Sequence, residues 1–187
     1  ETNTFQGSAI VLSEYGLHEN TYEINRRAAE LAREAAAKYA ADRRIVVAGS
    51  MGPTNKSISV TGGITFDELT RSFRIQSEGL IAGGVDYLLL ETQQDTLTIK
   101  AALNGLEEAF RKTNRRVPIA VSVTIEPNGT MLAGQNIEAL YYTFASRDLL
   151  YLGMNCATGP EKMTDHLRTL AGISHFPTAC VPNAGLP

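Results

Sequence analysis

Hydrophobic positions along the chain follow two alternating patterns. Segments with apolar residues at helical spacing are separated by short, nearly continuous apolar runs rich in β-branched residues. The segment 65–82 begins with a capping-box pattern, in which Thr65 is followed three residues later by Glu68, and it ends at paired glycines. The spacing predicts helices over residues 21–41, 65–82, 95–112, 136–147 and from 160 onward, and strands that end near residues 4, 49, 91, 124, 155 and 183.

This alternation predicts an α/β protein with a parallel sheet. Two architectures fit, an open doubly wound sheet and a closed (β/α)8 barrel. No Gly-x-Gly-x-x-Gly follows any predicted strand, so nucleotide binding on an open sheet has no support. The later repeats are about 30 residues long, and eight of them would total about 250 residues, the usual length of a barrel. We therefore predict a TIM barrel that is incomplete in this chain, because only six strands are predicted.

Composition narrows the class of protein further. The 187 residues are 43% hydrophobic and 20% charged, which is typical of a globular protein. A net charge of −3 and the lack of a basic cluster argue against nucleic acid as a partner. The apolar runs are strand-sized, so we expect no membrane helix. The polar, acidic start predicts no signal peptide, and two cysteines do not make a disulfide framework, so we expect a cytoplasmic protein.

Polar residues end the predicted strands, and in a barrel these ends meet at one mouth. Ser50 and Thr124 are interpreted as ordinary loop residues, because strands commonly end in such residues. Glu91 differs because it directly follows four apolar residues, so its carboxylate is expected to point into the mouth. A buried carboxylate needs a cationic partner, and a substrate ammonium would serve. The remaining strand-end candidates are Asn3, Asn155, Cys156 and Asn183.

Cys156 precedes a predicted helix start at Gly159-Pro160 and allows three interpretations. It could be a nucleophile, although no histidine follows closely. It could be inert packing, the commonest fate of a free cysteine, and the bare sequence favours this. It could also be one ligand of a metal whose other ligands lie outside the chain. Cys180 lies in the middle of an apolar run and is interpreted as a core residue.

The strand ends resemble the homocysteine-binding, zinc-dependent methyltransferase family. Six short motifs occur in the family's order over essentially all 187 residues. Those at residues 52–55 and 183–187 resemble in particular the branch of the cobalamin-dependent methionine synthases. The six motifs are Glu1-Thr-Asn-Thr-Phe5, Gly52-Pro-Thr-Asn55, Ile64-Thr-Phe-Asp67, Leu90-Glu-Thr92 with Asp95-Thr96, Gly153-Met-Asn-Cys156 with Gly159-Pro160, and Pro182-Asn-Ala-Gly-Leu-Pro187.

The resemblance implies a (β/α)8 barrel that holds zinc through three cysteines at its mouth. The first of these falls on Cys156, whereas the other two form a Gly-Gly-Cys-Cys motif that this chain lacks. The chain would then be a partial homocysteine-binding domain over residues 1–187, from about the end of strand two to strand seven. Glu91 would bind the substrate ammonium, and Asn155, Asn183 and Asn3 would lie around the substrate. Ser50 and Thr92 are further candidates close to the site.

The implied reaction is the transfer of a methyl group to the zinc-activated homocysteine thiolate, which gives methionine. In the cobalamin-dependent branch the donor is methylcobalamin, and cobalamin- and folate-binding modules of the full-length protein are the expected partners. A betaine- or S-methylmethionine-dependent homocysteine methyltransferase is one alternative, and a barrel fragment with only a structural role is another. A metal-free lyase or aldolase would need a lysine at a strand end, and no predicted strand ends in one.

Overall fold

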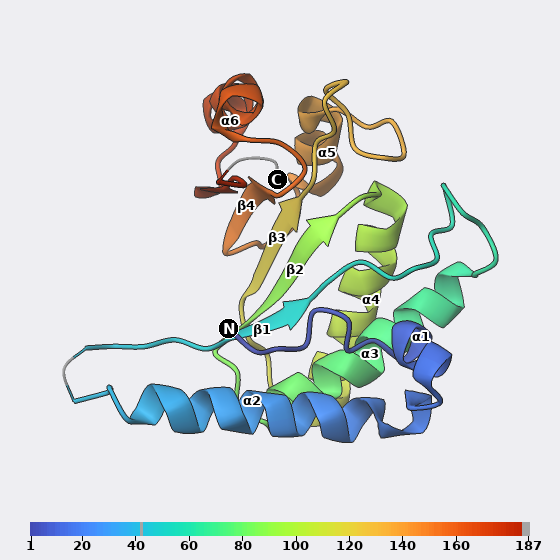
Figure 1. Ribbon diagram of the computed structural model, residues 1–187, viewed down its shortest axis with the longest axis vertical. Helices are drawn as coiled ribbons and strands as arrows, with labels where there is room; N and C mark the ends of the chain where they lie inside the picture. The colour runs from blue at the N-terminus through green and yellow to red at the C-terminus, as the bar shows by residue number, and fades with distance from the viewer. Residues whose placement is uncertain (42, 185–187) are drawn as a thin grey trace.

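A computed structural model describes residues 1–41 and 43–184. Within them a five-stranded parallel sheet runs in the order β1-β2-β3-β4-β5 (Figure 1). Residues 185–187 of the last resemblance motif lie outside the described residues. The strands are β1 (Ala48–Met51), β2 (Tyr87–Gln93), β3 (Ile119–Val123), β4 (Tyr151–Asn155) and β5 (Thr178–Val181).

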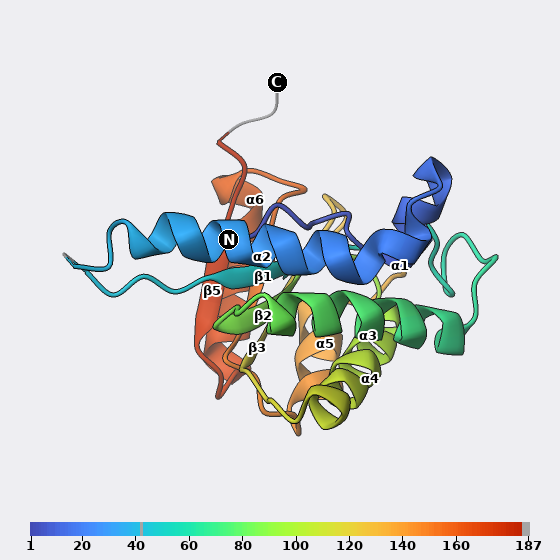
Figure 2. The same ribbon diagram turned by 90° about the horizontal axis from the view of Figure 1, so that it is seen from below.

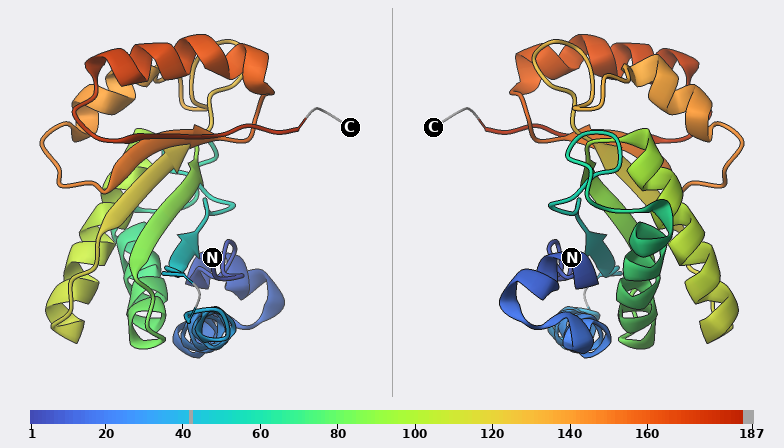
Figure 3. Two further views of the ribbon diagram at one scale, coloured as in Figure 1. Left: turned by 90° about the vertical axis from the view of Figure 1, so that its left-hand side faces the viewer. Right: turned by 90° about the vertical axis from the view of Figure 1, so that its right-hand side faces the viewer.

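Helices alternate with these strands along the chain, and Figure 3 shows them forming an arc around one side of the curved sheet. This is the arrangement of a TIM-barrel-like fold, as the sequence pattern predicted. The helices are α1 (Ala9–Leu12), α2 (Thr21–Ala37), α3 (Phe66–Ala82), α4 (Thr96–Thr113), α5 (Ile137–Phe144) and α6 (Pro160–Ile173), with short 3-10 turns at Ser13–Tyr15 and His18–Asn20.

The first predicted strand, ending near residue 4, is wrong as a strand. Residues 1–5 instead run beside β1 and make isolated hydrogen bonds to it. The amide of Thr2 donates to the carbonyl of Ala48 at 2.9 Å, and that of Gly52 donates to Phe5 at 2.8 Å. The segment covers the free edge of β1 without forming a regular ladder, and Figure 1 shows the N-terminus beside this strand.

The two faces of the sheet have different surroundings. Paired residues of parallel strands point to the same side, so alternate positions share a face. Outward-facing side chains such as Leu90, Val121 and Met154 join the main hydrophobic core beneath the helices. The inner face holds a separate small cluster, with Ala120 and Leu89 at its centre. The polar strand-end residues lie on this inner side.

Helices α2 and α3 lie side by side (Figure 2) and approach each other closely through glycines. A Cβ atom on Gly79 or Gly83 would collide with the backbone carbonyl oxygens of Tyr22 and Arg26. The predicted capping box of α3 is confirmed, because Thr65 accepts from the Glu68 amide and Glu68 accepts from the Thr65 amide.

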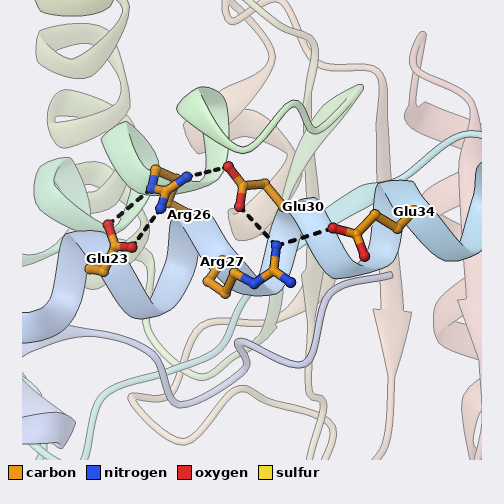
Figure 4. A network of polar contacts seen from close by, with 5 residues as sticks. All are labelled: Glu23, Arg26, Arg27, Glu30 and Glu34. Atoms are coloured by element: carbon orange, nitrogen blue, oxygen red, sulfur yellow. Dashed lines mark hydrogen bonds and ion pairs between the residues drawn. The ribbon is translucent and has the colours of Figure 1, made fainter.

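The exposed side of α2 carries a chain of ion pairs, which Figure 4 shows. Arg27 bridges Glu30 at 3.2 Å and Glu34 at 3.1 Å, and Arg26 pairs with Glu23 and Glu30. Ion pairs on an exposed helix surface are screened by water and contribute little to stability. The network therefore supports the helix and keeps this surface polar, and it lies apart from the strand ends.

Candidate active site

Four neighbouring strands bring polar side chains together at their carboxyl ends, on the inner face of the sheet. Ser50 belongs to β1, Glu91 to β2, Ser122 to β3 and Asn155 to β4. Hydrogen bonds join them in two groups, Ser50 with Glu91 and Ser122 with Asn155. The carboxyl ends of parallel strands are where barrel enzymes place their chemistry, so this rim is the candidate active site.

Glu91 is a half-buried carboxylate at this rim. The Ser50 hydroxyl donates a hydrogen bond to its Oε1. Burial raises the pKa of Glu91 and the nearby Glu1 carboxylate adds to this shift, whereas the Ser50 hydrogen bond and the amino group of Glu1 oppose it. Within the described part of the chain, no lysine or arginine side chain acts on this carboxylate. A cationic ligand would therefore meet an available negative group here.

Replacing Glu91 by glutamine should stabilise the fold more at neutral pH than in acid. The raised pKa means that the folded chain holds the Glu91 proton more tightly than the unfolded chain. This tighter proton binding stabilises the folded wild type fully below the ordinary pKa of glutamate, and the stabilisation is lost as pH rises through the raised pKa. Glutamine does not ionise, so the variant avoids this loss at neutral pH. Urea unfolding of Glu91→Gln and wild type at a series of pH values measures this. A difference in free energy of unfolding that does not grow with pH would contradict the raised pKa.

Asn155 links β4 to the two strands before it. Its Oδ1 accepts from the Thr92 amide at 3.1 Å and from the Ser122 hydroxyl at 2.6 Å. Its Nδ2 donates to the Thr92 hydroxyl at 2.8 Å. Asn155, which was predicted to contact substrate, therefore uses most of its hydrogen-bonding groups within the protein.

Cys156 follows Asn155 directly and is exposed at the rim. Its exposure rules out the interpretation as core packing. Cys156 and Ala157 both have a φ of 58°, a left-handed conformation that non-glycine residues rarely adopt, and the Cys156 amide donates to Val181 at 3.2 Å. Cys180 differs, because it is partly buried and packs against the main core, as its predicted core position requires.

The two outer asparagines are less closely connected to this rim. Asn183 is half-buried and lies two residues beyond Val181, which pairs with Asn155. Asn3 is exposed and lines a hollow of about 570 Å³ together with Leu17 and other residues at and before α2. The hydrogen bonds found among the described residues join neither asparagine side chain to Glu91 or Asn155. Their predicted contacts with substrate remain predictions.

Sequence reasoning underestimated two serines of the site. The residue pattern alone favoured an ordinary loop role for Ser50, and only the family resemblance made it a candidate, yet its hydroxyl contacts Glu91. Ser122 was not singled out, because the predicted strand continued to Thr124 and Ser122 lies inside the apolar run. The alternation of strand side chains was the available signal, since Ser122 lies two residues after the inward-facing Ala120.

Comparisons with known proteins agree with this architecture. Two structures of the homocysteine methyltransferase MmuM from Escherichia coli, its oxidized and metallated forms, match with TM-scores of 0.80 and 0.81. Each is 24% identical to this chain, and the matches cover 98% of this chain but 65% and 66% of those chains. The apo form matches with a TM-score of 0.73 at 25% identity, over 89% of this chain and 61% of that one.

The fold is therefore that of a partial TIM-barrel-like α/β protein with its candidate site at the carboxyl ends of the strands. The homocysteine S-methyltransferase family matches residues 1–187, and the chain belongs to this family. It spans about 65% of the length of the MmuM structures. Among the helices in the described ranges, none is both long enough and apolar enough to cross a membrane.

Proposed function

We propose that residues 1–187 form a partial homocysteine-binding barrel domain of a methyltransferase that converts homocysteine to methionine. The observation that carries the proposal is the hydrogen-bonded link between two parts of the rim. Asn155, next to Cys156, bonds to Thr92, which is next to Glu91. Glu91, whose carboxylate could bind an amino group, and Cys156, whose thiol could bind a metal, thus belong to one rim. Family membership and the fold of MmuM support this assignment.

Glu91 binds the ammonium group of homocysteine in this proposal. The half-buried carboxylate has a serine hydroxyl as its partner and no basic side chain among those described. A substrate ammonium would supply the missing positive charge and stabilise the ionised carboxylate. Asn183 and Asn3 are proposed to lie farther out around the substrate, and no residue of this chain is assigned as a general acid or base.

Zinc is the proposed metal, and Cys156 fits as one of its ligands because its thiol is exposed and it directly follows Asn155 at the end of β4. The described residues contain no group of three metal-binding side chains. Of the two cysteines in the sequence, Cys180 packs against the core on the outer side. The two further cysteines that the resemblance implies must come from outside this chain. When bound, zinc would favour the thiolate form of homocysteine, which is the nucleophile.

The proposed methyl donor is methylcobalamin, carried by another module of a cytoplasmic methionine synthase. This rests on the resemblance of residues 52–55 and 183–187 to the cobalamin-dependent branch. Betaine and S-methylmethionine are the competing donors. A purely structural barrel fragment is the alternative from another class, and the exposed Cys156 argues against it.

The test is methionine formation by the complete gene product, meaning the longest polypeptide encoded in frame with residues 1–187. Homocysteine is supplied with methylcobalamin, betaine or S-methylmethionine in turn, before and after removal of metal with a chelator. We expect methionine with methylcobalamin, its loss on chelation and its return with zinc. We also expect the 187-residue chain alone to form none. Absence of methionine with every donor at full zinc occupancy would overturn the proposal.

A further inference from the structure

The backbone of β2 is irregular at Glu91 and Thr92. Leu90 pairs with Val121 of β3, whereas Gln93 pairs with Val123. Two residues of β2, Glu91 and Thr92, therefore lie opposite the single residue Ser122, which is the arrangement of a β-bulge. Bulges next to active sites re-aim side chains, and this one includes the Glu91 carboxylate of the rim.

Within this bulge, Thr92 adopts an unfavourable backbone conformation. Its φ is 58°, and a β-branched residue in the left-handed region is a conformational outlier. Such a residue is strained and persists only where its surroundings hold it in place. The bulge therefore needs hydrogen bonds that hold Thr92 in this conformation, and we call the group that supplies them a clamp.

Asn155 supplies the clamp. Its carboxamide accepts from the Thr92 amide at 3.1 Å and donates to the Thr92 hydroxyl at 2.8 Å, so one side chain grips both polar groups of the strained residue. The Ser122 hydroxyl, 2.6 Å from Asn155 Oδ1, fixes the orientation of the carboxamide. On the other side of the strand, the Gln93 side chain donates to the Glu91 carbonyl at 3.1 Å.

We infer that Asn155 is a positioning residue, which holds the left-handed bulge at Thr92 and thereby aims the Glu91 carboxylate at the substrate. This inference deepens the proposed function and rests on it for the identity of the ligand. It replaces the predicted direct contact between Asn155 and substrate. Both acceptor positions of Oδ1 and one of the two amide hydrogens are already used within the protein.

Hydrogen exchange tests the clamp without reference to activity. In the complete gene product, exchange of the Thr92 amide is followed at single-amide resolution. Asn155→Ala should speed this exchange at least about tenfold while the Leu90 amide is unchanged, because one hydrogen bond is lost. Asn155→Asp keeps an acceptor oxygen and should retain the protection. Unchanged exchange at Thr92 in Asn155→Ala would overturn the inference whether or not the protein binds homocysteine.

Ligand selectivity tests the consequence for Glu91. Dissociation constants are measured for homocysteine and for 4-sulfanylbutanoate, which has the thiol and carboxylate but no amino group. Asn155→Ala should weaken homocysteine about tenfold and leave the analogue unchanged, because only the ammonium contact depends on Glu91. Equal weakening of both ligands would show direct contact of Asn155 with another part of the substrate and would overturn the inference.

A glycine at position 92 provides the rescue experiment. Glycine adopts a positive φ without strain, so Thr92→Gly should form the bulge without the clamp. Adding Asn155→Ala to Thr92→Gly should then cost less than about threefold in homocysteine affinity, against about tenfold in the wild-type background. Equal costs in the two backgrounds would overturn the positioning role. If wild type shows no preference for homocysteine over the analogue, the proposed function fails instead, and the exchange result still decides the clamp.

Discussion

Glu91→Gln should weaken homocysteine binding by about 30-fold, equivalent to about 2 kcal/mol. The carboxylate is half-buried, and the basic side chains of the described residues leave it unpaired, so a substrate ammonium would be its main positive partner. Glutamine keeps the shape and can still accept from Ser50, but it carries no charge. The measurement is the homocysteine KM of the complete gene product, together with its zinc content, which should be unchanged.

The amino-free analogue 4-sulfanylbutanoate is the control for this prediction. Its affinity should be the same in wild type and Glu91→Gln, because it has no ammonium group to lose. Ser50→Ala is the matched variant at the same rim, since it removes the neutral partner of Glu91 and leaves the charge. It should change homocysteine affinity much less than Glu91→Gln. Equal homocysteine affinity in wild type and Glu91→Gln would indicate that Glu91 has only a structural role.

The order of strands and helices was predictable because each element has a recognisable pattern in its own local sequence. Buried parallel strands are continuous apolar runs, and the helices show their spacing and caps, as with Thr65 and Glu68 at the start of α3. The N-terminal segment was mispredicted as a strand. Its hydrogen bonds to Ala48 and from Gly52 depend on the edge of β1, which lies more than 40 residues away, and no local pattern encodes that.

The site was predictable only in part, for a related reason. A carboxylate directly after an apolar run marks Glu91 as a strand-end residue, and strand topology then places Asn155 and Cys156 at the same edge. The bulge at Thr92 was not predictable, because threonine gives no sign of a positive φ. Its conformation is imposed by a side chain 63 residues away. The role of Asn155 therefore depends on the folded arrangement of β2 and β4, which the local sequence does not encode.

Cys156→Ser should weaken zinc binding by more than about 100-fold and abolish methyl transfer in the complete gene product. Loss of a residue that merely orients a ligand costs about 10- to 100-fold in metal affinity, so loss of a thiolate ligand should cost more. Serine is a poor substitute, because its hydroxyl does not ionise near neutral pH. Zinc content after purification and methionine formation measure the two effects.

Cys180→Ala is the matched control, since it removes the other thiol of the chain. Cys180 packs against the core from the outer side of β5, and burial raises the pKa of its thiol, which opposes the thiolate form that a metal requires. The variant should keep its zinc and activity and lose only about 1 kcal/mol of unfolding free energy. Normal zinc content in Cys156→Ser, or loss of zinc in Cys180→Ala, would contradict a zinc site at the rim that Glu91 and Asn155 share.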